Sequence, residues 1–361
     1  MDSQSNPFLK PITPAAQTDV DQNAALFEAV LGSEEADRYR ALVAGENRQP
    51  RQKAVDVGAR AKEALASKQD LFEAVVKSRM ERFFKVDLPI KFEEQAEHLI
   101  ELGFLETNEK GEKGVTGIDG KFYTLPTPEQ VVAYFTAPEH KAFFERKAEE
   151  GFTRLLITPF AATMESLAEQ ASRVLLNYRG GKNPTKIELI ESDRDGHLFY
   201  EVTKFDKTNH GGKTKRQLLS ESSQPFPGFR IQFLQEDLIV PRAGQGTTIK
   251  NRPALEAGEE AKKYLKMFQD PTSPYYNEHG LIPEDWLTLF TTTLDKTNTV
   301  IDDFADGKTA ATYLTGCYDI KTPYDVPTAQ WNRGYGEAFA GLYRRLRSQD
   351  NPDFGVRTAV S

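Results

Sequence analysis

The chain ends with VPTAQWNRGY (residues 326–335), EAFAGLYRR (residues 337–345) and NPDFGVRTAV (residues 351–360). This tail opens on Trp-Asn-Arg-Gly, carries a cluster of arginines in its middle, and closes on Gly-Val-Arg-Thr-Ala. It is the most distinctive stretch of the sequence.

The tail resembles the end of the formylglycine-generating-enzyme branch of C-type-lectin-like folds, in which the last strand carries a Gly-Phe-Arg or Gly-Val-Arg signature. The resemblance implies specific roles for three residues of that signature. Gly355 lets two backbones approach closely, since it has no side chain. Val356 belongs to the core. Arg357 bonds to loop carbonyls and acidic side chains, which locks the terminal strand in place.

Two kinds of protein in that branch imply different functions. Oxidative formylglycine generation uses a pair of cysteines, and this chain has only Cys317, so the resemblance does not extend to that enzyme. The other kind comprises the target proteins of diversity-generating retroelements, which place a variable ligand-binding surface ahead of the terminal signature. The resemblance therefore implies a non-catalytic binding protein without a cofactor, whose partner is a protein or a surface ligand.

The corresponding binding segment runs from Trp331 to about Arg347. Tyrosine offers a rigid amphipathic ring and asparagine an adaptable hydrogen-bonding group, and both are typical of binding surfaces. The predicted contact residues are Trp331, Asn332, Arg333, Tyr335, Glu337, Phe339, Tyr343 and Arg344. The alternative interpretation is a surface segment that binds no partner.

Charge composition argues against nucleic acid as the partner. The chain has 54 acidic and 46 basic residues and a formal net charge of -8. No positive field dominates such a molecule, so bulk binding to nucleic acid or to an anionic membrane is disfavoured. The densest basic run is Tyr343-Arg344-Arg345-Leu346-Arg347, and a solvated helix or loop face is its expected structure.

Cysteine content and hydropathy predict a cytoplasmic protein. The single cysteine, Cys317, allows no internal disulfide and lies in an apolar context typical of a buried thiol. The N-terminus lacks the basic and apolar regions of a secretory signal. No stretch approaches the roughly 18 apolar residues that a membrane span needs. Display at a surface is therefore expected only through a partner.

The length of 361 residues and the pattern of elements predict an α+β protein. A helical N-terminal region is followed by a mixed α/β region that ends in the C-type-lectin-like domain. The predicted parts are a loose segment over residues 1–19, a helical region over 20–86, a central α+β region over 87–257, and the terminal region over 258–361. Asp87-Leu88-Pro89 is expected to end the helical region.

Local signals predict individual elements within these regions. Thr127-Pro128 is typical of a helix start, with an N-cap followed by proline at the first helical position. Pro283 opens a second helix, in which Trp286 and Phe290 are expected to face the core. The alternating residues Phe229 to Leu234 predict a strand.

Motifs for catalysis or metal binding are absent or incomplete. Gly211-Gly212-Lys213-Thr214 resembles the end of a phosphate loop, but Lys207 stands where the loop needs a glycine. Gly244-Gln245-Gly246 lacks the third glycine of a dinucleotide fingerprint, so a flexible loop is expected. The Asp-Arg-Asp-Gly run at residues 193–196 lacks the glutamate of a calcium loop.

Two alternative functions remain open from the sequence. One is an enzyme whose site is assembled from dispersed acids, arginines and either His197 or His210. The five histidines show no metal-binding spacing, so such a site requires distant residues. The other is a structural or assembly protein of phage-like origin that associates through the residues before Phe84. The oligomeric state itself is not predicted by the sequence.

Overall fold

The structure is a computed structural model. It describes residues 76, 78–178, 184–189, 203–205, 212–221, 224–303, 307, 309–319, 325–332, 338–346 and 351–361. Tertiary contacts divide the chain into two compact units, Met1–Arg79 and Met80–Ser361. The second unit spans the predicted boundary at residues 257 and 258, so the central and terminal regions fold together. The predicted segments 1–19 and most of 20–86 lie outside the described residues.

The second unit begins with a long helix that does not end where the sequence suggested. A π-helical turn over Phe83–Asp87 leads directly into α4 (Leu88–Glu101). The N–H of Leu88 donates to the carbonyl of Phe83, five residues earlier. The wider turn accommodates Pro89, which has no N–H for the usual bond, so the helix continues through the expected break. Gly103, with φ 76°, then terminates it.

A small meander and two helices follow. The meander consists of β1 (Glu106–Thr107), β2 (Lys113–Thr116) and β3 (Phe122–Thr124), paired antiparallel in that order. After it come α5 (Pro128–Thr136) and α6 (Pro138–Glu149). The predicted start of α5 is confirmed, because Thr127 and Gln130 bond reciprocally as a capping box.

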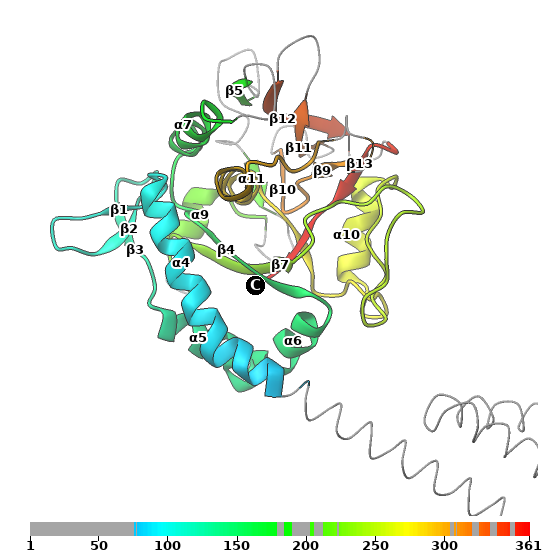
Figure 1. The fold of residues 1–361 in the computed structure, drawn as a ribbon, viewed down its shortest axis with the longest axis horizontal. Coiled ribbons are helices and arrows are strands. Elements are labelled where there is room, and N and C mark those ends of the chain that lie inside the picture. Colours follow the sequence, from blue (N-terminus) through cyan, green and yellow to red (C-terminus); the bar gives the residue numbers. More distant parts are fainter. Residues whose placement is uncertain are drawn as a thin grey trace, which may run out of the picture. The chain divides into compact units, whose positions relative to one another are not determined.

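The terminal strand lies inside a four-stranded sheet with the order β4-β7-β14-β8. Its members are β4 (Phe152–Thr158), β7 (Arg230–Gln235), β14 (Thr358–Val360) and β8 (His279–Gly280). The two longest of these strands, β4 and β7, come from the central region that carried no recognisable motif. Figure 1 shows the red C-terminal strand running beside the green strand β7.

A second sheet has the order β13-β9-β11-β12-β5. Its members are β13 (Phe354–Val356), β9 (Ala311–Tyr313), β11 (Asp325–Asn332), β12 (Ala338–Leu346) and β5 (Pro184–Leu189). The expected helix or loop over the arginine run is therefore wrong, because the residues up to Leu346 form β12 and pair with β11. A further antiparallel pair joins β10 (Cys317–Asp319) to β6 (Thr203–Phe205).

Helix α11 (Pro283–Thr297) is the central core element of this unit. Every residue from Pro283 to Leu294 is buried, and the helix contacts β4, β11 and α7 (Met164–Leu175). The predicted core roles of Trp286 and Phe290 are confirmed, since their rings stack with centroids 4.9 Å apart. A helix buried on all sides cannot present a surface stripe, so its residues hold the fold together.

Two shorter helices complete the unit. Helix α10 (Ala261–Gln269) covers β13, and Tyr264 and Phe268 pack into one apolar cluster with Phe354 and Val356. Helix α9 (Lys215–Leu219) follows the candidate phosphate-loop residues, and Thr214 caps its N-terminus. The α+β class expected from the sequence is confirmed. In the described parts of the chain, no helix has the length and apolar character of a membrane span.

Candidate functional site

The predicted role of Arg357 is confirmed at the point where the two sheets meet. Arg357 lies between β13, which belongs to one sheet, and β14, which belongs to the other. Its Nη2 donates to Oδ1 of Asp302 at 2.8 Å, its Nη1 donates to Oδ2 at 3.2 Å, and Nη2 also donates to the carbonyl of Leu238. The guanidinium therefore binds one acid and one loop carbonyl, as the signature implied.

Asp302 is a buried junction that the sequence did not reveal. Its carboxylate also accepts a hydrogen bond of 2.6 Å from Nε1 of Trp286 in α11. Its backbone carbonyl accepts the N–H of Trp331 in β11 at 3.0 Å. Its φ is 57°, in the left-handed region that aspartate tolerates better than most residues. One residue thus ties the terminal strand to both the central helix and β11.

Gly355 and Val356 also behave as predicted. A Cβ built on Gly355 would lie 2.6 Å from a methyl carbon of Val240 and 3.1 Å from the backbone of Ala257. No other residue type fits this contact without displacement, so the glycine is required for the close approach. Val356 is buried in the cluster beneath α10.

A second buried charge network lies on the other side of the terminal strand. Glu278 is its centre, and its carboxylate accepts bonds from Nζ of Lys147 at 2.8 Å, from Nε and Nη2 of Arg252 at 2.7 Å each, and from the hydroxyl of Thr358 at 2.6 Å. Lys147 also donates to Glu150 at 2.7 Å. Burial opposes ionisation of Glu278, but the bonds from Arg252 outweigh it and hold its pKa below the usual value.

The guanidinium of Arg252 is further enclosed by aromatic rings. Its central carbon lies 4.9 Å from the ring centre of Tyr275 and 5.2 Å from that of Phe152. Arginine suits such a position, because its planar group stacks on rings while its edge bonds to a carboxylate. The network fixes the loop that carries Arg252 against the terminal strand.

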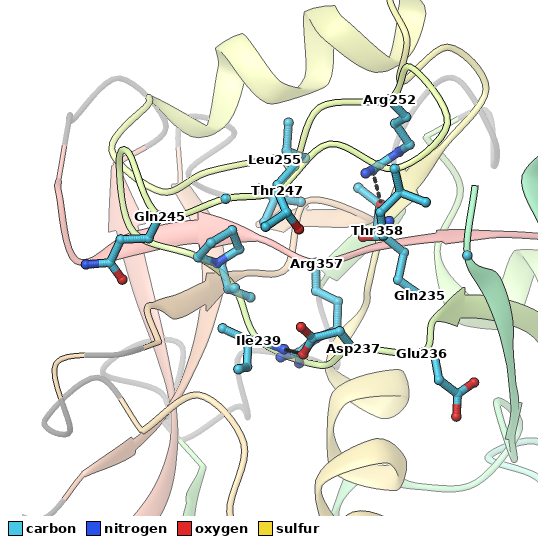
Figure 2. A pocket seen from close by; sticks show the side chains of 17 residues that line it. Gln235, Glu236, Asp237, Ile239, Gln245, Thr247, Arg252, Leu255, Arg357 and Thr358 are labelled. Carbon is cyan, nitrogen blue, oxygen red and sulfur yellow. Dashed lines mark hydrogen bonds between the residues drawn. The ribbon is translucent and has the colours of Figure 1, made fainter. Parts of the chain in front are cut away.

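A cavity of about 350 Å³ lies between these two networks. Arg252, Arg357 and Thr358 line it on the side of the terminal strand, and the loop over residues 237–255 supplies much of the remaining wall. In Figure 2, Arg252 and Thr358 lie to the right and are joined by a hydrogen bond, and Gln245 lies at the left. Its concave shape and its walls from separate segments make this cavity a candidate ligand site.

The glycines in that loop serve a structural purpose. The carboxylate of Glu256 accepts the N–H of Gly244 and that of Gly246, each at 2.8 Å. These two bonds lower the pKa of Glu256 below its usual value. The sequence predicted a flexible loop at Gly244-Gln245-Gly246. In the structure the carboxylate of Glu256 binds the backbone N–H groups of both glycines and so organises this loop.

The predicted contact residues fall into three groups. Trp331 has a described side chain. Asn332, Phe339, Tyr343 and Arg344 lie on β11 and β12, whose backbone pairing is described. Arg333, Tyr335 and Glu337 lie outside the described residues. The pairing places Asn332 opposite Phe339 and Tyr343 opposite Thr328, so the predicted residues cluster on one antiparallel hairpin.

Trp331 is a correction to the predicted contact set. Its side chain is 0% exposed, and its ring stacks on Phe290 with centroids 5.9 Å apart. Tyr178 meets the ring edge-on at 5.5 Å. A fully enclosed indole cannot touch a partner, so Trp331 anchors β11 to α11 instead of contacting a ligand.

The histidines described in the structure have local partners. Nε2 of His98 lies 2.8 Å from a carboxylate oxygen of Asp295, and Nε2 of His279 lies 3.0 Å from the hydroxyl of Ser361. Burial of His279, together with nearby Arg230, lowers its pKa from 6.5 to about 3. Such a weakly basic imidazole is poorly suited to accept a proton near neutral pH. His197 and His210, named for the enzyme alternative, lie outside the described residues.

Two sequence candidates remain, Cys317 and the Asp-Arg-Asp-Gly run, and the structure describes the first of them. Cys317 is buried, as expected, and its thiol faces the carbonyl of Leu314 at 3.7 Å. The Asp-Arg-Asp-Gly run lies outside the described residues. Within the part of the chain that the structure describes, no group of three or more His, Cys, Asp or Glu side chains is placed to hold a metal ion.

No protein-family profile, curated protein or solved structure matches the chain.

Proposed function

We propose that this chain is a binding protein that presents the segment from Asn332 to Arg344, here called the hairpin surface, to a protein or surface ligand. The observation that carries the proposal is the way in which β11 is held. Trp331, next to the hairpin surface, is enclosed by Phe290 and Tyr178, and its backbone N–H donates to the backbone carbonyl of Asp302. A surface next to so many fixed contacts is preorganised, which lowers the entropic cost of binding.

The alternation of strand residues supports the same interpretation. Ala340 and Leu342 of β12 are buried, and side chains along a strand alternate between the two faces. Alternation predicts that positions 339 and 343 lie on the face opposite Ala340 and Leu342. Gly341, which lies between them, is also buried, so we propose that the contact side chains are those toward the end of the hairpin.

The connection between the two strands supports it as well. Asn332 at the end of β11 pairs with Phe339 near the start of β12. The residues between them, which include Arg333, Tyr335 and Glu337, leave and rejoin the sheet at neighbouring positions. Of these, tyrosine and arginine are enriched at protein interfaces.

The resemblance of the tail supports a further part of the proposal, that a retroelement diversifies this surface. In that case the scaffold residues Trp331, Asp302 and Arg357 stay fixed while the hairpin surface changes. His197 and His210 of the enzyme alternative, and most of the residues before Phe84 that the assembly alternative uses, lie outside the described ranges. The described contacts favour neither of them over binding.

Site-specific photo-crosslinking tests the proposal. A benzophenone amino acid is placed singly at Tyr335, Phe339 or Tyr343, and the full chain is irradiated in its native cells. We expect all three positions to give the same discrete adduct, because they belong to one surface. A crosslinker at Leu176, which is 74% exposed and lies on neither β11 nor β12, is the control.

Two outcomes contradict the proposal. One is that the three hairpin positions give no adduct. The other is that Leu176 gives the same adducts in the same yield, since nonspecific encounters do not distinguish between exposed positions.

A further inference from the structure

We infer that the cavity between Arg252 and Arg357 is a second binding site, and that it takes an uncharged polyhydroxylated molecule of metabolite size, such as a sugar. The inference is independent of the proposed function, since the residues that line the cavity do not include the hairpin surface. It rests on the size of the cavity, on its charge balance and on the chemistry of its walls.

The size fits a small metabolite. A volume of about 350 Å³ lies at the lower end of the range of about 300–1,000 Å³ that is typical of small-molecule sites. Its walls come from separated parts of the chain, including β7, the loop over residues 237–255 and the terminal strand. The two charge networks hold the lining residues Arg252 and Arg357 in place, so this wall exists before any ligand arrives.

The charge balance disfavours an anionic ligand. Arg357 is paired with the buried carboxylate of Asp302, and Arg252 with that of Glu278. Each positive charge is already compensated, and the exposed acids Glu236 and Asp237 lie at the wall. A phosphate or carboxylate would enter without a net positive field and would lose its hydration.

Hydrogen-bond donors nevertheless remain available in the cavity. Nη1 of Arg252 donates to the carbonyl of Pro253 at a long 3.4 Å. Nη1 of Arg357 carries two hydrogens and makes one bond, to Asp302. These N–H groups suit neutral oxygen acceptors such as hydroxyl groups. A buried donor that gains such a partner contributes to both affinity and specificity.

The other walls match a molecule that both donates and accepts. Gln235, Gln245 and Thr247 line the cavity, and each carries donor and acceptor atoms. Among the described residues of the lining, none is aromatic, so a planar base finds no ring on which to stack. Hydroxyl groups distributed around a compact carbon skeleton satisfy this mixture of walls better than a flat heterocycle does.

The mouth of the cavity offers apolar contact. Ile239 is 54% exposed and Ile249 is 39% exposed, and both line the cavity. They are two of the few large apolar side chains that the described surface leaves exposed. The C–H faces of a sugar ring can cover such side chains while its hydroxyl groups reach the polar walls.

Saturation-transfer NMR on the full chain tests the inference with three probes: glucose, glucose 6-phosphate and adenosine. We expect glucose to bind with a dissociation constant of about 1 mM or tighter, and both other probes to bind at least ten-fold more weakly. Glucose 6-phosphate differs from glucose by its charge, and adenosine provides a planar base. The comparison with glucose 6-phosphate tests whether the cavity disfavours an anionic ligand. The comparison with adenosine tests whether it disfavours a planar base.

Variants locate the bound glucose. Ile249→Trp fills the mouth from an exposed position and is expected to weaken glucose binding at least ten-fold, while the melting temperature stays the same. Leu176→Trp, at an exposed position outside the lining, is expected to leave binding unchanged. The inference is overturned if glucose shows no transfer, if either other probe binds as tightly, or if Ile249→Trp binds glucose as the parent chain does.

Discussion

Arg357 and Asp302 form a two-point ion pair, with Nη2 of the arginine 2.8 Å from Oδ1 and Nη1 3.2 Å from Oδ2 of the aspartate. The pair is buried where the terminal strand passes from one sheet to the other. Because Asp302 also binds Trp286 and Trp331, the pair joins the chain end to the central helix and to the strand beside the hairpin surface.

Removal of Arg357 should destabilise the fold strongly. Arg357→Ala leaves the carboxylate of Asp302 buried with no cation, and we expect a loss of about 3–5 kcal/mol in the free energy of unfolding. Arg357→Lys keeps the charge but loses the forked geometry, so its loss should be smaller. Urea denaturation followed by circular dichroism measures both.

The control for this prediction is Arg242→Ala. Arg242 lies 2.6 Å from a carboxylate oxygen of Asp353, but both side chains reach solvent. We expect a loss of at most about 1 kcal/mol for such a pair. Equal losses for Arg357→Ala and Arg242→Ala would show that the buried pair does not hold the terminal strand.

Neutralisation of Glu278 should be similarly costly. Glu278→Gln preserves the shape of the side chain but removes its negative charge. Arg252 then loses its paired carboxylate, and Lys147 loses one of the two carboxylates with which it pairs. We expect a loss of about 3–5 kcal/mol, measured by the same denaturation. Lys263→Ala, which breaks a solvent-exposed pair with Glu259, is the comparison and should change stability by no more than about 0.5 kcal/mol.

Trp331 should behave as a core residue and its neighbour Asn332 as a surface residue. Trp331→Ala removes a fully enclosed ring, so we expect a loss of about 3–5 kcal/mol. Asn332→Ala should change stability by no more than about 0.5 kcal/mol, the size typical of surface substitutions. If Trp331→Ala is as stable as the parent protein, Trp331 is not a core residue and belongs with the predicted contact residues.

The buried His279 predicts a dependence of stability on pH. Its pKa in the folded chain is about 3, below the ordinary 6.5, so the unfolded chain binds a proton that the folded chain excludes. The stabilising contribution is complete above about pH 6.5 and is lost progressively as the pH falls toward 3. The free energy of unfolding should therefore decrease over this range as the solution is acidified.

A His279→Gln variant isolates this effect. Glu278 also has a lowered pKa and loses stability in acid, but it is present in both proteins. We expect the variant to show a shallower decrease between pH 6.5 and 4 than the parent chain shows. Identical slopes in the two proteins would mean that His279 titrates alike in the folded and unfolded states.

The sequence predicted those features whose causes are local. Thr127 and Pro128 mark the start of α5, and Pro283 marks the start of α11, because caps and prolines act within one turn. The partners of Arg357 were predicted by class, an acid and a carbonyl, and the structure supplies Asp302 and Leu238. The break expected before Pro89 was wrong, because a π-helical turn absorbs the missing N–H.

Features assembled from distant segments had no comparable signal. Lys147, Arg252, Glu278 and Thr358 come from four separate stretches, and nothing in any one stretch indicates the network. The pairing of β7 with β14 likewise depends on the whole fold. Trp331 was misassigned because an aromatic residue next to polar ones is equally typical of a binding surface and of an anchor.

The most direct test of the proposed binding surface is to compare this gene among closely related isolates. The account predicts that substitutions concentrate at codons 332, 333, 335, 337, 339, 343 and 344, at adenines of a nearby template copy. Trp331, Ala340, Leu342 and the Gly355-Val356-Arg357 signature should stay constant, since they are buried or hold the terminal strand. Substitutions spread evenly along the chain, with no template copy nearby, would contradict a diversified binding surface.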